Sequence, residues 1–185
     1  MIAGLIIAAV IAVDQIVKIL VRANMTLGEK RPLIPGFVEM YHTENGGASF
    51  GILKDARWVF MILSTIALVI MLYVLIRYYK THVLLNVSLA FLIGGGIGNM
   101  IDRLFVTNAA GEKVVTDMFN FTFVDFAIFN VADIFITTGT ILLAVFVLFY
   151  YSKTWEKLKK PGSMAESAVV KADAEQNSNE DNGNA

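Results

Sequence analysis

The sequence predicts an all-α membrane protein with four transmembrane helices and a small extracytoplasmic β-sheet. Of its 185 residues, 56% are hydrophobic and only 17% are charged, whereas soluble domains carry about 25% charged residues. A helix needs about 20 apolar residues to cross the hydrocarbon core of a bilayer. Four stretches approach this length: residues 2–21, 58–76, 83–101 and 131–151.

The first stretch is predicted to be a retained helix rather than a cleaved signal peptide. No basic segment precedes it, and it contains Asp14, Gln15 and Lys18 without an A-x-A cleavage site. Asp14 and Lys18 are four residues apart with the acid first, which favours an ion pair on one helix face. The simplest interpretation of this pair is structural, as a contact that docks the helix against its neighbours.

The distribution of Lys and Arg predicts the orientation in the membrane. Short cytoplasmic flanks are enriched in these residues, and they gather at 77–80 and 153–160. An even number of spans then places both termini in the cytoplasm and the loops 24–57 and 102–130 on the extracytoplasmic side. The asymmetry is incomplete, because the first of these loops also carries basic residues.

The connecting and terminal segments differ in composition. Residues 37–41 alternate as a strand does, and Asn45-Gly46-Gly47 indicates a turn, so a small sheet is expected in the first outer loop. Residues 161–185 are rich in Ala, Asn, Asp, Glu and Ser without an aromatic residue, which predicts a disordered cytoplasmic tail. Residues 1–160 are predicted to form one transmembrane domain before that tail.

The composition excludes several kinds of site. There is no cysteine, and the two histidines, His42 and His82, are far apart in the sequence. Disulfides, thiolate nucleophiles and zincin-type metal sites are therefore excluded. The net charge of −1 argues against a nucleic-acid partner.

Ionisable residues within the third span are candidate functional groups, because charge is costly in the bilayer. Asn99, Asp102 and Arg103 share one helix face by their spacing, and Asp102 is predicted to pair with the adjacent Arg103. The four glycines between 94 and 98 would allow another backbone to approach closely.

A second group of polar residues lies in the apolar segment 114–136: Asp117, Asp125, Asn130 and Asp133. Asn130 and Asp133 are three residues apart and are expected to share a helix face, where Asn130 could hold the carboxylate. Two carboxylates in a low-dielectric site share one proton, so one can activate water while the other protonates a carbonyl oxygen. These residues alone leave open a protease, a proton-coupled carrier using Asp14, Asp102 and Asp133, or a structural subunit.

Five motifs in this order resemble those of the bacterial lipoprotein signal peptidases, also called signal peptidase II. They are residues 14–18 (DQIVK), 45–51 (NGGASFG), 98–103 (GNMIDR), 114–119 (VVTDMF) and 129–133 (FNVAD). The resemblance extends from about residue 12 to residue 151, which is essentially the whole membrane portion.

This resemblance implies an aspartic endopeptidase that cleaves prolipoprotein signal peptides before a diacylglyceryl-modified cysteine, without a metal or other cofactor. Its catalytic pair would be Asp117 and Asp133. The substrate would lie between the third and fourth spans near the glycines, and the loop 31–53 would cover its lipid-modified cysteine. A monomer in contact with membrane lipids is expected, with an extracytoplasmic active site and these supporting residues: Asp14, Lys18, Asn45, Asn99, Asp102, Arg103 and Asn130.

The first catalytic aspartate has a competitor. The connection from Arg103 to Asp117 is longer than expected for the family, and Thr116 interrupts the V-V-D motif. Asp125, in Val124-Asp125-Phe126, imitates the same motif. Asp117 is preferred, because Asp125 would lie more than two helical turns from Asp133 if the fourth helix began early, at roughly 1.5 Å rise per residue.

Overall fold

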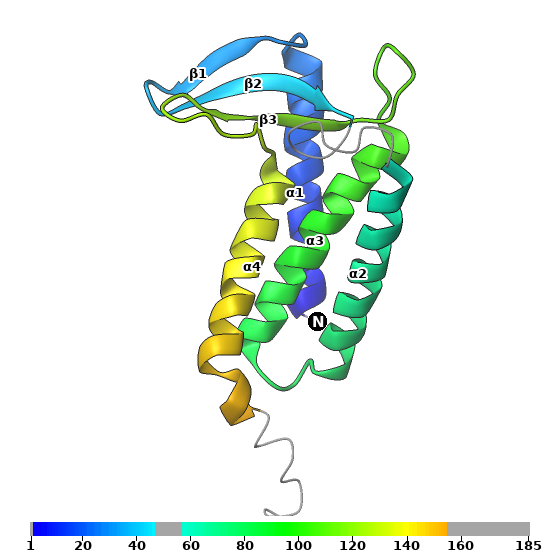
Figure 1. Ribbon diagram of the computed structural model, residues 1–185, viewed down its shortest axis with the longest axis vertical. Coiled ribbons are helices and arrows are strands. Elements are labelled where there is room, and N and C mark those ends of the chain that lie inside the picture. The colour runs from blue at the N-terminus through cyan, green and yellow to red at the C-terminus, as the bar shows by residue number, and fades with distance from the viewer. Residues whose placement is uncertain (1, 47–56, 155–185) are drawn as a thin grey trace, which may run out of the picture. The chain divides into compact units, whose positions relative to one another are not determined.

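The computed structural model describes residues 2–46 and 57–154. Within these ranges it consists of four helices and one antiparallel sheet (Figure 1). The elements are α1 (Ile2–Asn24), β1 (Lys30–Ile34), β2 (Val38–Asn45), α2 (Arg57–Arg77), α3 (Val83–Phe105), β3 (Val115–Phe121) and α4 (Val131–Phe149). The predicted class, a helical membrane protein with a small sheet, is confirmed.

The chain divides into two compact units, residues 1–144 and 145–185. The first unit contains every candidate site residue. In the second, residues 145–149 complete α4, and the predicted tail at 161–185 lies outside the described residues. The predicted boundary at residue 160, the orientation and the monomeric state stay predictions.

Three of the described helices, α1, α3 and α4, are long and apolar enough to cross a membrane. Helix α2 has 21 residues and is apolar over Met61–Arg77. The four helices therefore match the four predicted stretches, while a span at α2 stays a prediction. Large apolar side chains along α2 are exposed, among them Ile62, Leu63, Val69 and Ile70.

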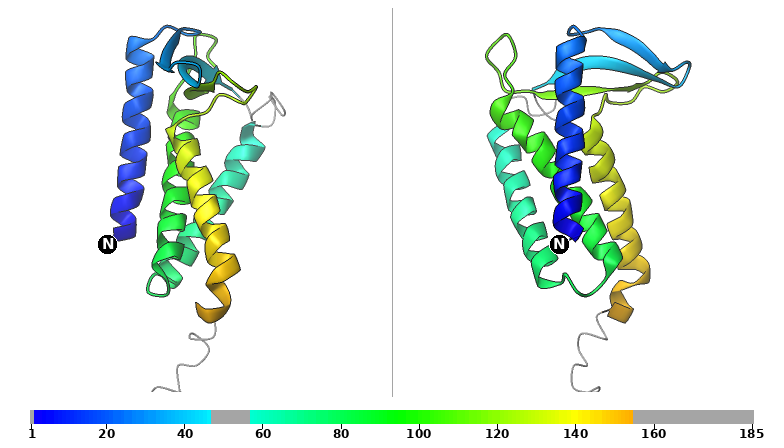
Figure 2. Two further views of the ribbon diagram at one scale, coloured as in Figure 1. Left: turned by 90° about the vertical axis from the view of Figure 1, so that its left-hand side faces the viewer. Right: turned by 180° about the vertical axis from the view of Figure 1, so that it is seen from behind.

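The sheet lies across the end of the helices at which α1 finishes and α4 starts (Figures 1 and 2). Its strand order is β1-β2-β3, and both pairings are antiparallel. The strand expected at 37–41 is confirmed and continues to Asn45 as β2. Strand β3 was not predicted, because its residues do not alternate regularly between polar and apolar. Its partner β2 is also far away in the sequence.

The glycines of α3 allow the other helices to pack closely against it. A Cβ added at Gly94 would lie 2.8 Å from the Val10 side chain of α1, and one at Gly95 would lie 2.6 Å from the Ala132 carbonyl oxygen of α4. A Cβ at Gly96 would lie 2.9 Å from Leu68 of α2. Each of these glycines thus serves a different neighbouring helix.

The expectation that a substrate backbone would use these glycines is wrong. Their open faces are occupied by α1, α2 and α4 of the same chain. Close packing of helices through small residues is the usual role of glycine in membrane interiors. These glycine positions therefore serve packing between helices of the chain.

The contact at Gly95 predicts a specific loss of stability. We expect Gly95→Ala to lower the free energy of unfolding by about 1–3 kcal/mol, because the added methyl group overpacks the α3–α4 contact. Gly4→Ala is the matched control, since nothing lies within 4 Å of a Cβ at that helical position. Thermal unfolding of the detergent-solubilised variants measures both, and equal stability of the two variants would contradict the packing role.

Candidate active site

Asp117 and Asp133 come from different elements that meet at the sheet-facing end of the helices. Asp117 lies in β3 and is 3% exposed. Asp133 lies in the first turn of α4 and is half-buried. Strand and helix are joined by residues 122–130, so the chain itself does not hold the two carboxylates at a set separation.

Asn130 precedes α4 and caps its first turn. The Asp133 backbone N–H donates to Asn130 Oδ1 at 3.1 Å, and the Asn130 backbone N–H donates to Asp133 Oδ2 at 3.2 Å. This reciprocal pair is a capping box, in which side chains accept from the free N–H groups of a helix start. The expectation that Asn130 holds the Asp133 carboxylate is confirmed, but Asn130 does so as the cap before α4, because the helix begins at Val131.

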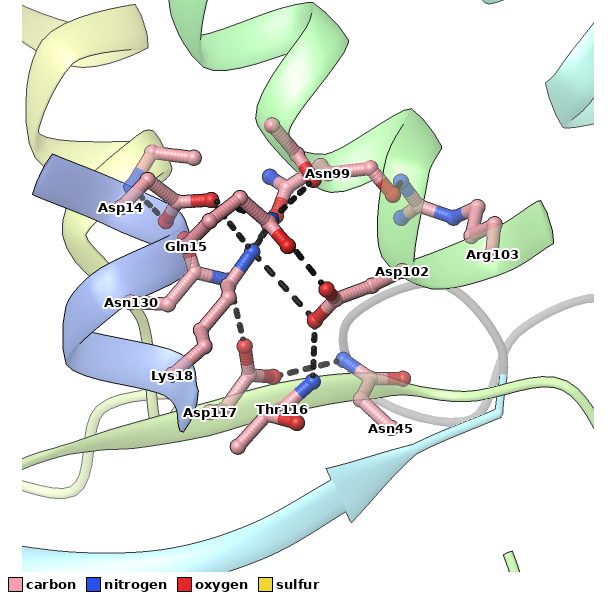
Figure 3. A network of polar contacts seen from close by, with 12 residues as sticks. Asp14, Gln15, Lys18, Asn45, Asn99, Asp102, Arg103, Thr116, Asp117 and Asn130 are labelled. Atoms are coloured by element: carbon pink, nitrogen blue, oxygen red, sulfur yellow. Dashed lines mark hydrogen bonds and ion pairs between the residues drawn. The ribbon is translucent and has the colours of Figure 1, made fainter. Parts of the chain in front are cut away.

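Two asparagine side chains connect the two carboxylates. Asn130 Nδ2 donates to Asp117 Oδ1 at 2.6 Å and to Asn99 Oδ1 at 3.0 Å. Asn99 Nδ2 donates to Asp133 Oδ1 at 2.8 Å. Asn45, at the end of β2, donates from Nδ2 to Asp117 Oδ2 at 3.1 Å. Each oxygen of Asp117 thus accepts one amide hydrogen bond (Figure 3).

A buried cation, the Lys18 ammonium group, contacts this amide network. Lys18 Nζ lies 2.9 Å from Asp14 Oδ2 and 3.5 Å from Asp102 Oδ2, and all three side chains are 0% exposed. Lys18 Nζ also donates to Asn99 Oδ1 at 2.9 Å. The predicted Asp14–Lys18 ion pair is confirmed, and Asp14 extends it to α4 by accepting from the Ala132 backbone N–H at 2.9 Å.

Asp102 does not pair with Arg103 as predicted. Its cationic partners are Lys18 and Arg22, the latter at 3.7 Å, because adjacent helix residues point in different directions. Arg103 instead interacts electrostatically with Asp133 and Asp117, and more weakly with Asp102. Its guanidinium donates to the Asn99 carbonyl oxygen at 3.3 Å.

Burial raises the pKa of Asp117 from 3.8 to about 6. The hydrogen bond from Asn130 opposes this rise, the neighbouring Asp133 adds to it, and the Asn45 hydrogen bond and the Lys18 charge oppose it more weakly. A carboxyl group with such a pKa can hold or release a proton near neutral pH.

Asp125, the competitor of Asp117, lies in the connection between β3 and α4 and is exposed. The structure brings together all nine predicted site residues, whereas the Asp125 side chain is exposed. Part of the motif at 45–51 lies outside the described residues, as does part of the loop 31–53 that was expected to cover the substrate.

Three further residues contribute to the site and were not predicted from the sequence. Gln15 donates from Nε2 to the Gly98 carbonyl oxygen at 3.0 Å and to Asp102 Oδ1 at 3.3 Å. Arg22 follows Asp14 and Lys18 at the same four-residue spacing, which was a usable signal. Thr116 is buried beside Asp117, and no sequence pattern indicated its role.

Within residues 2–46 and 57–154, no group of three or more His, Cys, Asp or Glu side chains is arranged to hold a metal ion. The polar partners of the two candidate carboxylates in this region are the amides and cations described above.

Comparison with solved structures first defines a class by its fold, which this membrane protein shares with two structures described as bacterial membrane enzymes. Two structures determined by the in meso method, at 2.3 and 1.9 Å resolution, each match with a TM-score of 0.72 and 30% sequence identity. The first match covers 79% of this chain and 87% of the other, and the second covers 80% and 93%.

Sequence comparison then identifies the family. The family model described as signal peptidase (SPase) II matches residues 6–149. Lipoprotein signal peptidases of Streptococcus pyogenes serotypes M5 and M18 are 39% identical over 135 residues, covering 73% of this chain and 85% of each relative. The chain belongs to the signal peptidase II family, whose role is the processing of prolipoproteins, and it is a peptidase of the cell membrane.

The buried ion cluster predicts which charge the fold requires. We expect Lys18→Met to lower the free energy of unfolding by about 3–5 kcal/mol, because Asp14 and Asp102 would lose their main cation inside the protein. Lys30→Met is the control, since Lys30 is 53% exposed and pairs with Glu39 on the surface, where a pair contributes at most about 1 kcal/mol. Similar thermal unfolding curves for both variants would contradict this role of Lys18.

Proposed function

We propose that this peptidase is an aspartic endopeptidase whose catalytic pair is Asp117 and Asp133. Its substrates would be prolipoproteins, cleaved before the diacylglyceryl-modified cysteine, as expected from its membership of the signal peptidase II family. The observation that carries the proposal is the pair of amide bridges, through Asn130 and Asn99, that links the two carboxylates.

The bridges fix the orientation of both carboxyl groups, while burial and the negative charge of Asp133 favour the protonated form of Asp117. An amide N–H donates to one oxygen of each carboxylate, which orients both groups without neutralising them. The raised pKa of Asp117 favours this carboxyl group as the proton carrier.

In the proposed reaction, ionised Asp133 removes a proton from a water molecule. The water oxygen bonds to the scissile carbonyl carbon while protonated Asp117 gives its proton to the carbonyl oxygen. The tetrahedral intermediate then carries two hydroxyl groups, and its collapse breaks the C–N bond. The leaving amine nitrogen takes the proton from Asp133, and one hydroxyl group of the intermediate gives its proton back to Asp117. The half-buried position of Asp133 allows water to reach it, and Arg103 moderates the negative charge of the pair.

The assignment predicts different results for three isosteric variants. We expect Asp117→Asn and Asp133→Asn each to lower kcat by at least about 10³-fold, because each removes one partner of the acid–base pair. Asp125→Asn, the exposed control, should process substrate at the normal rate. A gel shift of a lipid-modified prolipoprotein, incubated with each purified variant in detergent or liposomes, measures the cleavage.

The two possible failures are distinct. Full activity of Asp117→Asn would remove Asp117 from the pair. Loss of activity only in Asp125→Asn and Asp133→Asn would transfer the first catalytic role to Asp125.

The pH dependence of kcat/KM tests the role of Asp117 as the acid. Because Asp117 must be protonated and its pKa is about 6, kcat/KM should decline as the pH rises above about 6. Asn45→Ala removes a hydrogen bond that favours the ionised carboxylate, so the pKa rises and the decline moves to higher pH. Asp125→Asn should leave the profile in place, and a profile unmoved by Asn45→Ala would contradict the assignment.

A further inference from the structure

The residue before Asp117 is held by two other elements. Thr116 is 0% exposed, and its backbone N–H donates to Asp102 Oδ2 of α3 at 3.0 Å (Figure 3). Its hydroxyl oxygen, Oγ1, accepts from Arg22 Nη1 of α1 at 2.8 Å. Arg22 Nη1 is also 3.7 Å from Asp102 Oδ2. We call Arg22, Asp102 and Thr116 the threonine clamp.

The register between β2 and β3 changes next to Asp117. The pairing of β2 with β3 is regular from Val38↔Phe121 to Met40↔Phe119, and the register then shifts before Thr43↔Asp117. Beyond this irregularity, the ladder continues only to Asn45↔Val115, where β2 ends. The regular part of the ladder therefore does not determine the position of Asp117.

Position matters here because side chains alternate between the two faces of a strand. A shift of β3 by one residue would turn Asp117 away from Asn130 and bring Thr116 in its place. A contact made by Thr116 itself excludes this shift. The threonine clamp supplies such a contact from two helices at once.

We propose that Arg22, acting through the Thr116 hydroxyl, is a positioning residue that sets the place of the Asp117 carboxylate relative to Asp133. This inference rests on the proposed function, in which Asp117 is catalytic. Arg22 has no direct role in the chemistry, because its hydrogen bond is to Thr116 and its ion pair is to Asp102.

The clamp can be opened without removing the buried charges. Arg22 is 26% exposed, so water can replace its lost hydrogen-bond partner. Asp102 keeps Lys18 at 3.5 Å, the Gln15 amide and the Thr116 backbone N–H when the Thr116 hydroxyl is removed. Thr116→Val has nearly the same shape as threonine and lacks only this hydroxyl oxygen, so the variant should fold.

The experiment compares kcat, KM and the unfolding temperature of full-length variants on a lipid-modified prolipoprotein. Thr116→Val should lower kcat roughly 10- to 100-fold at nearly constant KM, because a displacement of about 1 Å costs this much in a transition state. Thr116→Ser, which retains the hydroxyl, should restore most of kcat. Arg22→Met should lower kcat similarly, but should cause no further loss in the Thr116→Val background.

Asn120→Ala is the matched control on the same strand. Asn120 Nδ2 donates to Glu39 Oε1 of β2 at 2.8 Å, on the regular side of the register shift. This variant loses a strand-to-strand hydrogen bond without opening the clamp, so its kcat should be unchanged.

Three results would overturn the inference: a normal kcat in Thr116→Val, equal loss in Thr116→Ser, or additive effects of the Arg22 and Thr116 substitutions. If Thr116→Val does not fold, the test rests on Arg22→Met. An unchanged kcat in Arg22→Met would then overturn the inference. Asp117→Asn, measured alongside, separates the two proposals. An inactive Asp117→Asn with an active Thr116→Val rejects only the clamp, whereas an active Asp117→Asn rejects the proposed function.

Discussion

The candidate site depends on one buried charge, the Lys18 ammonium group. A cation in the interior of a membrane protein must be compensated by nearby acceptors, and Lys18 finds them on its own helix and on α3. Asp14 also accepts a hydrogen bond from the backbone of α4. Compensation of this one charge therefore brings α1, α3 and the start of α4 together.

The amide network extends this arrangement to the two candidate carboxylates. Asn99 accepts from Lys18 through its oxygen, so its Nδ2 is directed to Asp133. Asn130 is likewise oriented by the capping box, with its Nδ2 left to reach Asp117. Neither side-chain amide can rotate by 180° without losing hydrogen bonds at both its oxygen and its nitrogen. The two carboxylates therefore keep their relative positions, even though one comes from a strand and the other from a helix.

Packing around α3 makes these short distances possible. Glycines on its surface let α1, α2 and α4 approach closely, and the sheet then covers the end at which the polar groups meet (Figure 1). Asp102 links the two parts, because it accepts from Gln15 of α1 and from the backbone of β3. The same residues thus stabilise the fold and place the candidate catalytic groups, so activity and stability must be measured together in variants of this site.

The sequence by itself determined the apolar helices, strand β2 and the Asp14–Lys18 pair, because helix period, strand alternation and four-residue spacing depend only on nearby residues. Its motifs also determined the family and most of the polar residues that meet, though not Arg22. Only the tertiary structure decided the partners: Asp102 with Lys18 and Arg22, Asn130 as a cap, the glycines against helices, and β3 as a strand. These contacts depend on which helix faces are brought together and on where α4 begins, and neither is encoded in the spacing of residues along one segment.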